Sequence, residues 1–324
     1  MKHHYWEMPI VIYLFLGGLG GGIMFLSAIF DFFIAPGAGV LFAWPMFIAL
    51  AALAVGCFFL VFELGQPLVF WRVWTTATAI IKWGATLLVI AMVFGALWWA
   101  SYLPWEWISG LAGVLAGGRG AFLAIAGFAG FGIMVYTGVM LSTLKAHAFW
   151  ATPALPVLFT ISATSTACAA IALGLGGWPV EFSLEAAVVA EIIREIIHVV
   201  DIVLVCAEIV VLLIMVLSFF GAGNVTAKAV ATRWVKGKTA PLFWIGMLGF
   251  GLVIPLILYV GGAHSPASEV VAPVLVLLGG LLLRYLCVYS DERAEIPGEN
   301  RYYNRIAKGD ENFVSKWRGK ENLY

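Results

Sequence analysis

Long apolar segments, separated by short polar or Pro- and Gly-containing breaks, dominate this 324-residue sequence. A helix needs about 20 apolar residues to cross the hydrocarbon core of a bilayer. Eight segments meet that length: 9–34, 39–63, 83–103, 120–144, 154–176, 187–220, 241–261 and 269–289. Hydrophobic residues make up 63% of the sequence and charged residues only 11%, whereas a soluble domain has about 25% charged residues. The sequence therefore predicts an all-α membrane protein with eight transmembrane helices.

The order of the eight spans suggests a division into two halves and a tail. Residues 1–149 are expected to form an N-terminal four-helix bundle, residues 150–290 a second four-helix bundle, and residues 291–324 a polar C-terminal tail. The tail carries aromatic residues such as Tyr302 and Trp317, and aromatic residues are enriched in protein interfaces. We predict that the tail docks a partner protein; a disordered, solvating tail is the alternative.

The distribution of basic residues predicts the orientation of the protein. An even number of spans places both termini on one side of the membrane. That terminal side holds nearly all of the cations of the loops: Lys2, Arg72, Lys82, Lys145, Lys228, Arg233, Lys236 and Lys238. By the positive-inside rule, the N- and C-termini are predicted to be cytoplasmic, in a cell (inner) membrane protein. A basic surface that docks a partner is the alternative explanation.

A first group of candidate site residues lies toward the terminal side. Glu63 ends the second apolar run, and an ionisable group at such a position needs solvent, a partner or a function. The predicted topology places Tyr13, Gln66 and Tyr136 at about the same depth. Phenols, a carboxyl group and a carboxamide beside apolar walls could hydrogen-bond the carbonyls of a quinone and exchange its protons. An ordinary belt of interfacial aromatic residues is the alternative.

A second group of candidate residues lies on the sixth span, within an arc of roughly 140° at 100° per residue. The group consists of Glu191, Arg194, Glu195, His198, Asp201 and Glu208. Charged groups in a membrane helix must face the bundle interior or a water-filled cavity. They form either a structural ion cluster or a proton path. Arg284, in the last span, is either a counter-charge for Glu208 or a cation that reaches the membrane surface.

Several segments resemble the NrfD/PsrC-type family of membrane subunits, which includes the polysulfide reductase and dimethyl sulfoxide reductase anchors. The similar segments are residues 6–9 (WEMP), 17–22 (GGLGGG), 63–67 (ELGQP), 70–72 (FWR), 136–138 (YTG), 161–166 (ISATST) and 278–280 (LGG). The resemblance covers nearly all of the membrane region and not the tail. Ile10 stands where relatives have Asn, so the hydrogen-bonding pattern that the resemblance implies does not carry over at this position.

The resemblance implies a membrane anchor that exchanges electrons between menaquinone or ubiquinone and a four-cluster, ferredoxin-like iron–sulfur subunit. That subunit serves a molybdopterin or multihaem catalytic subunit, so the catalytic substrate reacts elsewhere. The quinone-binding role carries over to Tyr13, Glu63 and Tyr136. We therefore expect a quinone-reactive subunit of a respiratory oxidoreductase, with proton translocation as an additional expectation.

The remaining features limit the cofactors and the other functions. The four cysteines are far apart and make no CxxC pair, so no iron–sulfur cluster is expected within the protein itself. A di-haem cytochrome b needs two pairs of His residues at matched depths, and only His198 is clearly inside the membrane; no haem is expected. No nucleic-acid partner is expected. An ion- or proton-coupled transporter is the alternative function, although the two halves show no evident inverted repeat.

Overall fold

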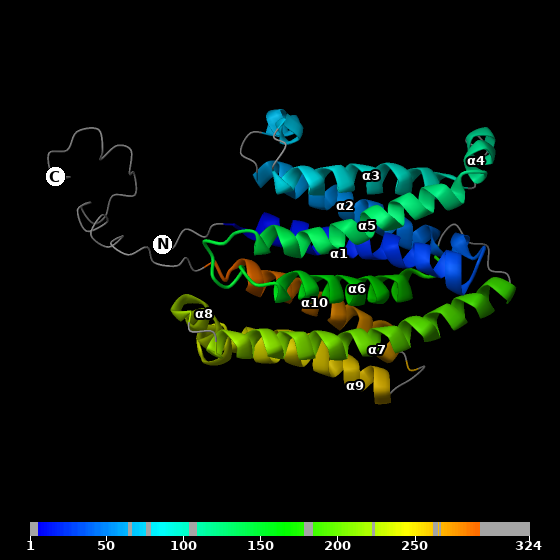
Figure 1. The fold of residues 1–324 in the computed structure, drawn as a ribbon. Coiled ribbons are helices and arrows are strands. Elements are labelled where there is room, and N and C mark those ends of the chain that lie inside the picture. The colour runs from blue at the N-terminus through cyan, green and yellow to red at the C-terminus, as the bar shows by residue number, and fades with distance from the viewer. Residues whose placement is uncertain are drawn as a thin grey trace.

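The fold is a bundle of long, roughly parallel and antiparallel helices (Figure 1). The computed structural model describes residues 6–63, 67–75, 79–103, 109–177, 184–221, 224–261, 265 and 267–291. Eight helical segments in this part of the protein are long and apolar enough to cross a membrane, and the described residues contain no strand. The prediction of an all-α membrane protein with eight spans is therefore confirmed.

Each predicted span corresponds to one or two helical elements. The first half contains α1 (Met8–Ile29) with η1 (Phe30–Ile34), η2 (Gly39–Phe42) with α2 (Ala43–Glu63), α3 (Ile80–Ala100) and α5 (Arg119–Ser142). The second half contains α6 (Ala154–Gly174), α7 (Leu184–Gly221), η5 (Leu242–Val253) with α9 (Ile254–Gly261), and η6 (Ala267–Val271) with α10 (Ala272–Val288). Among the described residues, the short helices that connect the spans are η3 (Pro67–Thr75), α4 (Ser109–Ala116) and α8 (Val225–Lys236).

α1 occupies the centre of the molecule because its glycines let other helices approach closely. It packs against α2, α5, α6 and α10. Three successive glycines face three different helices. A Cβ atom added at Gly20 would lie 2.9 Å from the Ala49 carbonyl oxygen of α2, and one added at Gly21 would lie 2.6 Å from the Gly130 carbonyl oxygen of α5. A Cβ atom added at Gly22 would lie 2.8 Å from the Ala163 carbonyl oxygen of α6. Small residues are the usual means of close helix packing in membranes. Because α1 contacts helices of both halves, the division into two bundles stays a prediction.

α7 is longer than the membrane is thick. Its 38 residues span about 57 Å at 1.5 Å per residue, whereas the hydrocarbon core is about 30 Å thick. In Figure 1 its N-terminal part extends beyond the neighbouring helices, at the end of the molecule that also carries α4. This end is opposite the terminal side, where α1 begins and α10 ends. A helix of this length must either tilt in the bilayer or project from it.

α8 is a short amphipathic helix on the terminal side. Asn224 caps its N-terminus by accepting hydrogen bonds from the backbone N–H groups of Thr226 and Ala227, both at 3.1 Å. The indole N–H of Trp234 donates to Ser290 Oγ at 2.9 Å, which fastens α8 to the end of α10. The predicted docking tail beyond residue 291 lies outside the described residues.

Candidate functional site

An apolar cavity of about 380 Å³ lies at the terminal side between α1, α2, η3, α3 and α5. Its wall is mostly aliphatic and aromatic, and includes Trp6, Trp74 and Cys57. The polar groups in this wall include the phenols of Tyr13 and Tyr136, which are 1% and 7% exposed. The Tyr136 hydroxyl has a weak acceptor in Met140 Sδ at 3.4 Å. An apolar pocket with a few placed polar groups is typical of small-molecule sites.

The structure brings together two of the four residues that were predicted to form a quinone site. Tyr13 and Tyr136 share the cavity, and Ile10 also lies in its wall. α2 ends at Glu63, but the Glu63 side chain and the whole of Gln66 lie outside the described residues. Their roles therefore stay predictions.

The sequence analysis missed the remainder of the wall, although a signal for part of it existed. Cys57, Leu60 and Val61 all line the cavity. Their spacing of three and four residues places them on one face of α2, and this face leads to Glu63. Trp6 and Trp74 could not be found in this way because they come from segments outside the spans.

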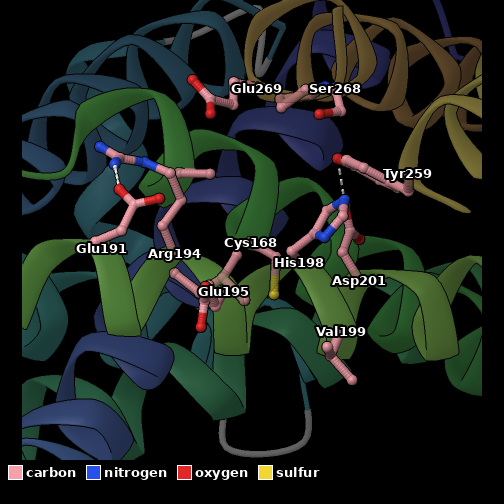
Figure 2. A pocket seen from close by; sticks show the side chains of 13 residues that line it. Cys168, Glu191, Arg194, Glu195, His198, Val199, Asp201, Tyr259, Ser268 and Glu269 are labelled. Atoms are coloured by element: carbon pink, nitrogen blue, oxygen red, sulfur yellow. Dashed lines mark hydrogen bonds and ion pairs between the residues drawn. The ribbon is translucent and has the colours of Figure 1, made fainter. Parts of the chain in front are cut away.

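A second, polar cavity of about 260 Å³ opens among α6, α7, α9 and η6 (Figure 2). Five of the six charged residues predicted on one face of the sixth span line it: Glu191, Arg194, Glu195, His198 and Asp201. Figure 2 shows Glu269 and Ser268 of η6 across the cavity from them. Of the α7 residues, Glu191 and Glu195 are exposed, Arg194 and His198 are partly buried, and Asp201 is buried. The face thus runs from the cavity mouth into the protein.

Hydrogen bonds mark the two ends of the polar cavity. At the mouth, Arg194 Nη1 donates to Glu191 Oε2 at 2.5 Å. At the inner end, Asp201 accepts hydrogen bonds from Ser165 Oγ at 2.5 Å and from the Tyr259 hydroxyl at 2.8 Å. Asp201 is only 1% exposed, so these two bonds replace its hydration. The Asp201 carboxylate is therefore held between α6 and α9.

Glu208 does not line the polar cavity with the other five. It lies two turns further along α7, is 4% exposed, and interacts with Ser162 of α6 and with the charge of Arg284 of α10. Arg284 is 0% exposed, so it does not reach the membrane surface; it is the counter-charge. The sequence pattern placed Glu208 on the correct face of α7, but it could not show which helices cover that part of the face.

Comparison with known proteins assigns the protein to a family. The family described as "Polysulphide reductase, NrfD" matches residues 1–291. The chain belongs to the NrfD family. Protein NrfD of Escherichia coli (strain K12) is 28% identical over 313 residues, which cover 89% of the present sequence and 95% of that protein. The C subunit of the polysulfide reductase of Wolinella succinogenes is 25% identical over 306 residues, with 89% and 94% covered.

Membership in the NrfD family agrees with the arrangement of the helices. The matched region includes all eight apolar helices and stops at the start of the polar tail. Together these findings identify a multi-pass inner-membrane protein, and they confirm the family to which the sequence motifs pointed.

Proposed function

We propose that this protein is the quinone-reactive membrane subunit of a respiratory oxidoreductase. Its membership in a family that includes a polysulfide reductase subunit supports the broader statement, a membrane subunit of such an enzyme. The observation that carries quinone reactivity is the shared apolar cavity of Tyr13 and Tyr136. The volume, about 380 Å³, lies within the range of about 300–1,000 Å³ that is common for small-molecule sites.

The residues present fit a quinone. When bound, a quinone supplies the two-electron, two-proton exchange of the complex. The aliphatic and aromatic wall would exclude water and hold the ring and the isoprenoid tail. The Tyr13 and Tyr136 hydroxyls would donate hydrogen bonds to its carbonyl oxygens. Glu63, at the end of α2, would exchange protons with the solution on the terminal side.

We further propose that the charged face of α7 conducts protons from the polar cavity into the membrane. A fully buried carboxylate costs free energy unless it is paired or hydrogen-bonded. The presence of Asp201 and Glu208 inside the membrane region therefore favours a functional role for both. They are separated by two turns of one helix, and both lie beside hydroxyl groups of α6: Ser165 donates a hydrogen bond to Asp201, and Ser162 contributes to the electrostatic surroundings of Glu208. A structural ion cluster around Arg194, made by Glu191, Glu195 and His198 at the cavity mouth, would not need the two buried carboxylates.

Membership in the family supports a catalytic oxidoreductase partner in a complex. We propose a ferredoxin-like subunit with four iron–sulfur clusters, which passes electrons to or from a molybdopterin or multihaem catalytic subunit. The terminal side is the docking surface that we propose, because the quinone cavity opens near it and electron transfer requires proximity. Lys145, Lys228 and Lys236 are exposed there and would complement an acidic partner. The proposed cytoplasmic position of the termini rests on the positive-inside rule.

The quinone site is tested by Tyr13→Phe and Tyr136→Phe in the complex purified from native membranes. Loss of one hydrogen bond costs about 1 kcal/mol, so each variant should raise the KM for a soluble quinol analogue about fivefold. Tyr102→Phe, at the other end of the bundle, is the matched control and should leave the KM unchanged. If neither cavity variant alters the KM or the amount of bound quinone, the proposed site is wrong.

The proton path is tested separately with Glu195→Gln, Asp201→Asn and Glu208→Gln. The complex should still assemble, while turnover that is coupled to proton uptake should slow, most strongly for the two buried carboxylates. Unchanged turnover in all three variants would leave only the structural ion cluster.

A further inference from the structure

Arg284 carries a full charge in the interior of the membrane region without a direct carboxylate contact. It is 0% exposed. Its guanidinium donates hydrogen bonds to Ser162 Oγ at 2.5 Å, to the Gly280 carbonyl at 3.0 Å and to the Phe159 carbonyl at 3.3 Å. All three acceptors are neutral. A buried cation with only neutral acceptors is costly unless an anion lies nearby.

Glu208 is the buried carboxyl group whose electrostatic surroundings include both Arg284 and Ser162. Among the described residues, no carboxylate oxygen lies within 4.0 Å of the guanidinium. Ser162 instead lies between the charges: its oxygen accepts from Arg284, and it interacts with Glu208. A hydroxyl can accept and donate at the same time, so Ser162 can donate its own proton to the carboxylate. The hydrogen bond from Arg284 to Ser162 joins α10 to α6, and Glu208 of α7 lies close enough to both side chains to interact with them electrostatically.

The same guanidinium borders the helix that carries Tyr13. Gly18 of α1 has no side chain, and a Cβ there would lie 3.5 Å from Arg284 Nη2. Gly18 follows Tyr13 by five residues, which is about 8 Å along the helix axis. Arg284 therefore lies between the charged face of α7 and the back of the proposed quinone site. The other titratable groups that face this arrangement are Asp201 on α7 and Cys287 on α10.

We propose that Arg284 is a positioning residue that acts through Ser162 to make Glu208 the innermost proton acceptor of the α7 path. A nearby positive charge favours the ionised form of a carboxylate, so Glu208 is available to take a proton. Once Glu208 is protonated, the charge of Arg284 is uncompensated, and release of that proton is favoured. The use of this proton in quinone chemistry rests on the proposed function, whereas the electrostatic coupling between Arg284 and Glu208 does not.

The test combines a double-mutant cycle with infrared spectroscopy of the full-length protein in its native complex. Arg284→Gln should reduce quinone turnover about tenfold or more, since an opposite charge at short range commonly shifts a proton equilibrium by that factor. Adding Glu208→Gln should then cause little further loss. At neutral pH a protonated-carboxyl band should grow in Arg284→Gln and disappear in the double variant. Arg119→Gln, outside the proposed path, is the matched arginine control and should show neither change.

Two further variants keep the test decisive. Arg284→Lys retains the charge and should restore most of the turnover that Arg284→Gln loses. If Arg284→Gln does not fold, Ser162→Ala keeps both charges and removes the bridge, and it should give the same carboxyl band with a smaller loss of turnover. Additive losses in the cycle, or an unchanged carboxyl band in all variants, would overturn the proposal. The infrared result requires no quinone, so a failure of the quinone site would leave it standing.

Discussion

Replacing Gly21 with alanine should destabilise the membrane region, because α5 leaves no room for its Cβ. The added atom would lie 2.6 Å from the Gly130 carbonyl oxygen, whereas ordinary van der Waals contact begins at 3.4 Å. α1 and α5 must therefore separate by about 0.8 Å, the difference between the two distances. The obstacle is a backbone oxygen that cannot rotate away, so the upper part of the usual cost of overpacking applies, about 2–3 kcal/mol.

The same substitution also brings a gain. Alanine in a helix is favoured over glycine by about 1 kcal/mol, so the net loss for Gly21→Ala should be about 1–2 kcal/mol. Gly17→Ala is the matched control from the same glycine cluster. Its Cβ would meet nothing closer than Thr137 Cγ2 at 3.7 Å, so that variant should be unchanged or more stable by up to about 1 kcal/mol.

The comparison can be made by reversible unfolding of the full-length protein in mixed micelles, titrated with sodium dodecyl sulfate and followed by tryptophan fluorescence. The midpoint for Gly21→Ala should fall below that of the parent protein, and the midpoint for Gly17→Ala should not. Equal midpoints for the two variants would refute the argument that backbone contact between α1 and α5 limits this position.

Two other predictions concern buried polar groups and the cavity wall. Tyr259→Phe removes one of the two hydrogen bonds to the buried Asp201 carboxylate, and the same titration should show a loss of about 1–3 kcal/mol; no change would mean that the bond contributes nothing to stability. In the native fold, a membrane-permeant maleimide should label Cys57, which lines the apolar cavity, before the buried thiols of Cys168 and Cys287. A quinone analogue should protect Cys57, and unchanged labelling of Cys57 would contradict the proposed site.

The transmembrane helices could be predicted from the sequence because length and hydropathy determine them. The span predicted at 269–289 is found at Ser268–Val288, and that predicted at 120–144 at Arg119–Ser142. The third span, predicted to begin at residue 83, begins at Ile80, because Lys82 was taken as a boundary although it lies in the first turn of the helix. α8 was missed because it is too short and too polar to register as a span. Its cap residue and its buried positions spaced by three and four residues were nevertheless visible in the sequence.

The sequence predicted which candidate residues share one face of a helix, but not which other helices pack against that face. Helical spacing correctly placed the charged residues of the sixth span on one face, and topology brought Tyr13 and Tyr136 to one end of the molecule. Glu208 lies outside the polar cavity, on a part of the α7 face that packs beside α6. Such positions depend on packing between helices, which the periodicity of a single segment does not contain. The role of Arg284 was left open for the same reason.

The central place of α1 has a consequence for how the protein is made. Among the described spans α1 is synthesised first, yet its glycines pack against α2, α5 and α6, and α10 completes its surroundings. During synthesis part of the α1 surface therefore stays exposed to lipid until α10 has been inserted. A nascent polypeptide interrupted after α5 would leave Gly22 facing lipid and the inner end of the α7 path unbuilt. Assembly of the membrane region thus depends on α1 remaining inserted until α10 has packed against it.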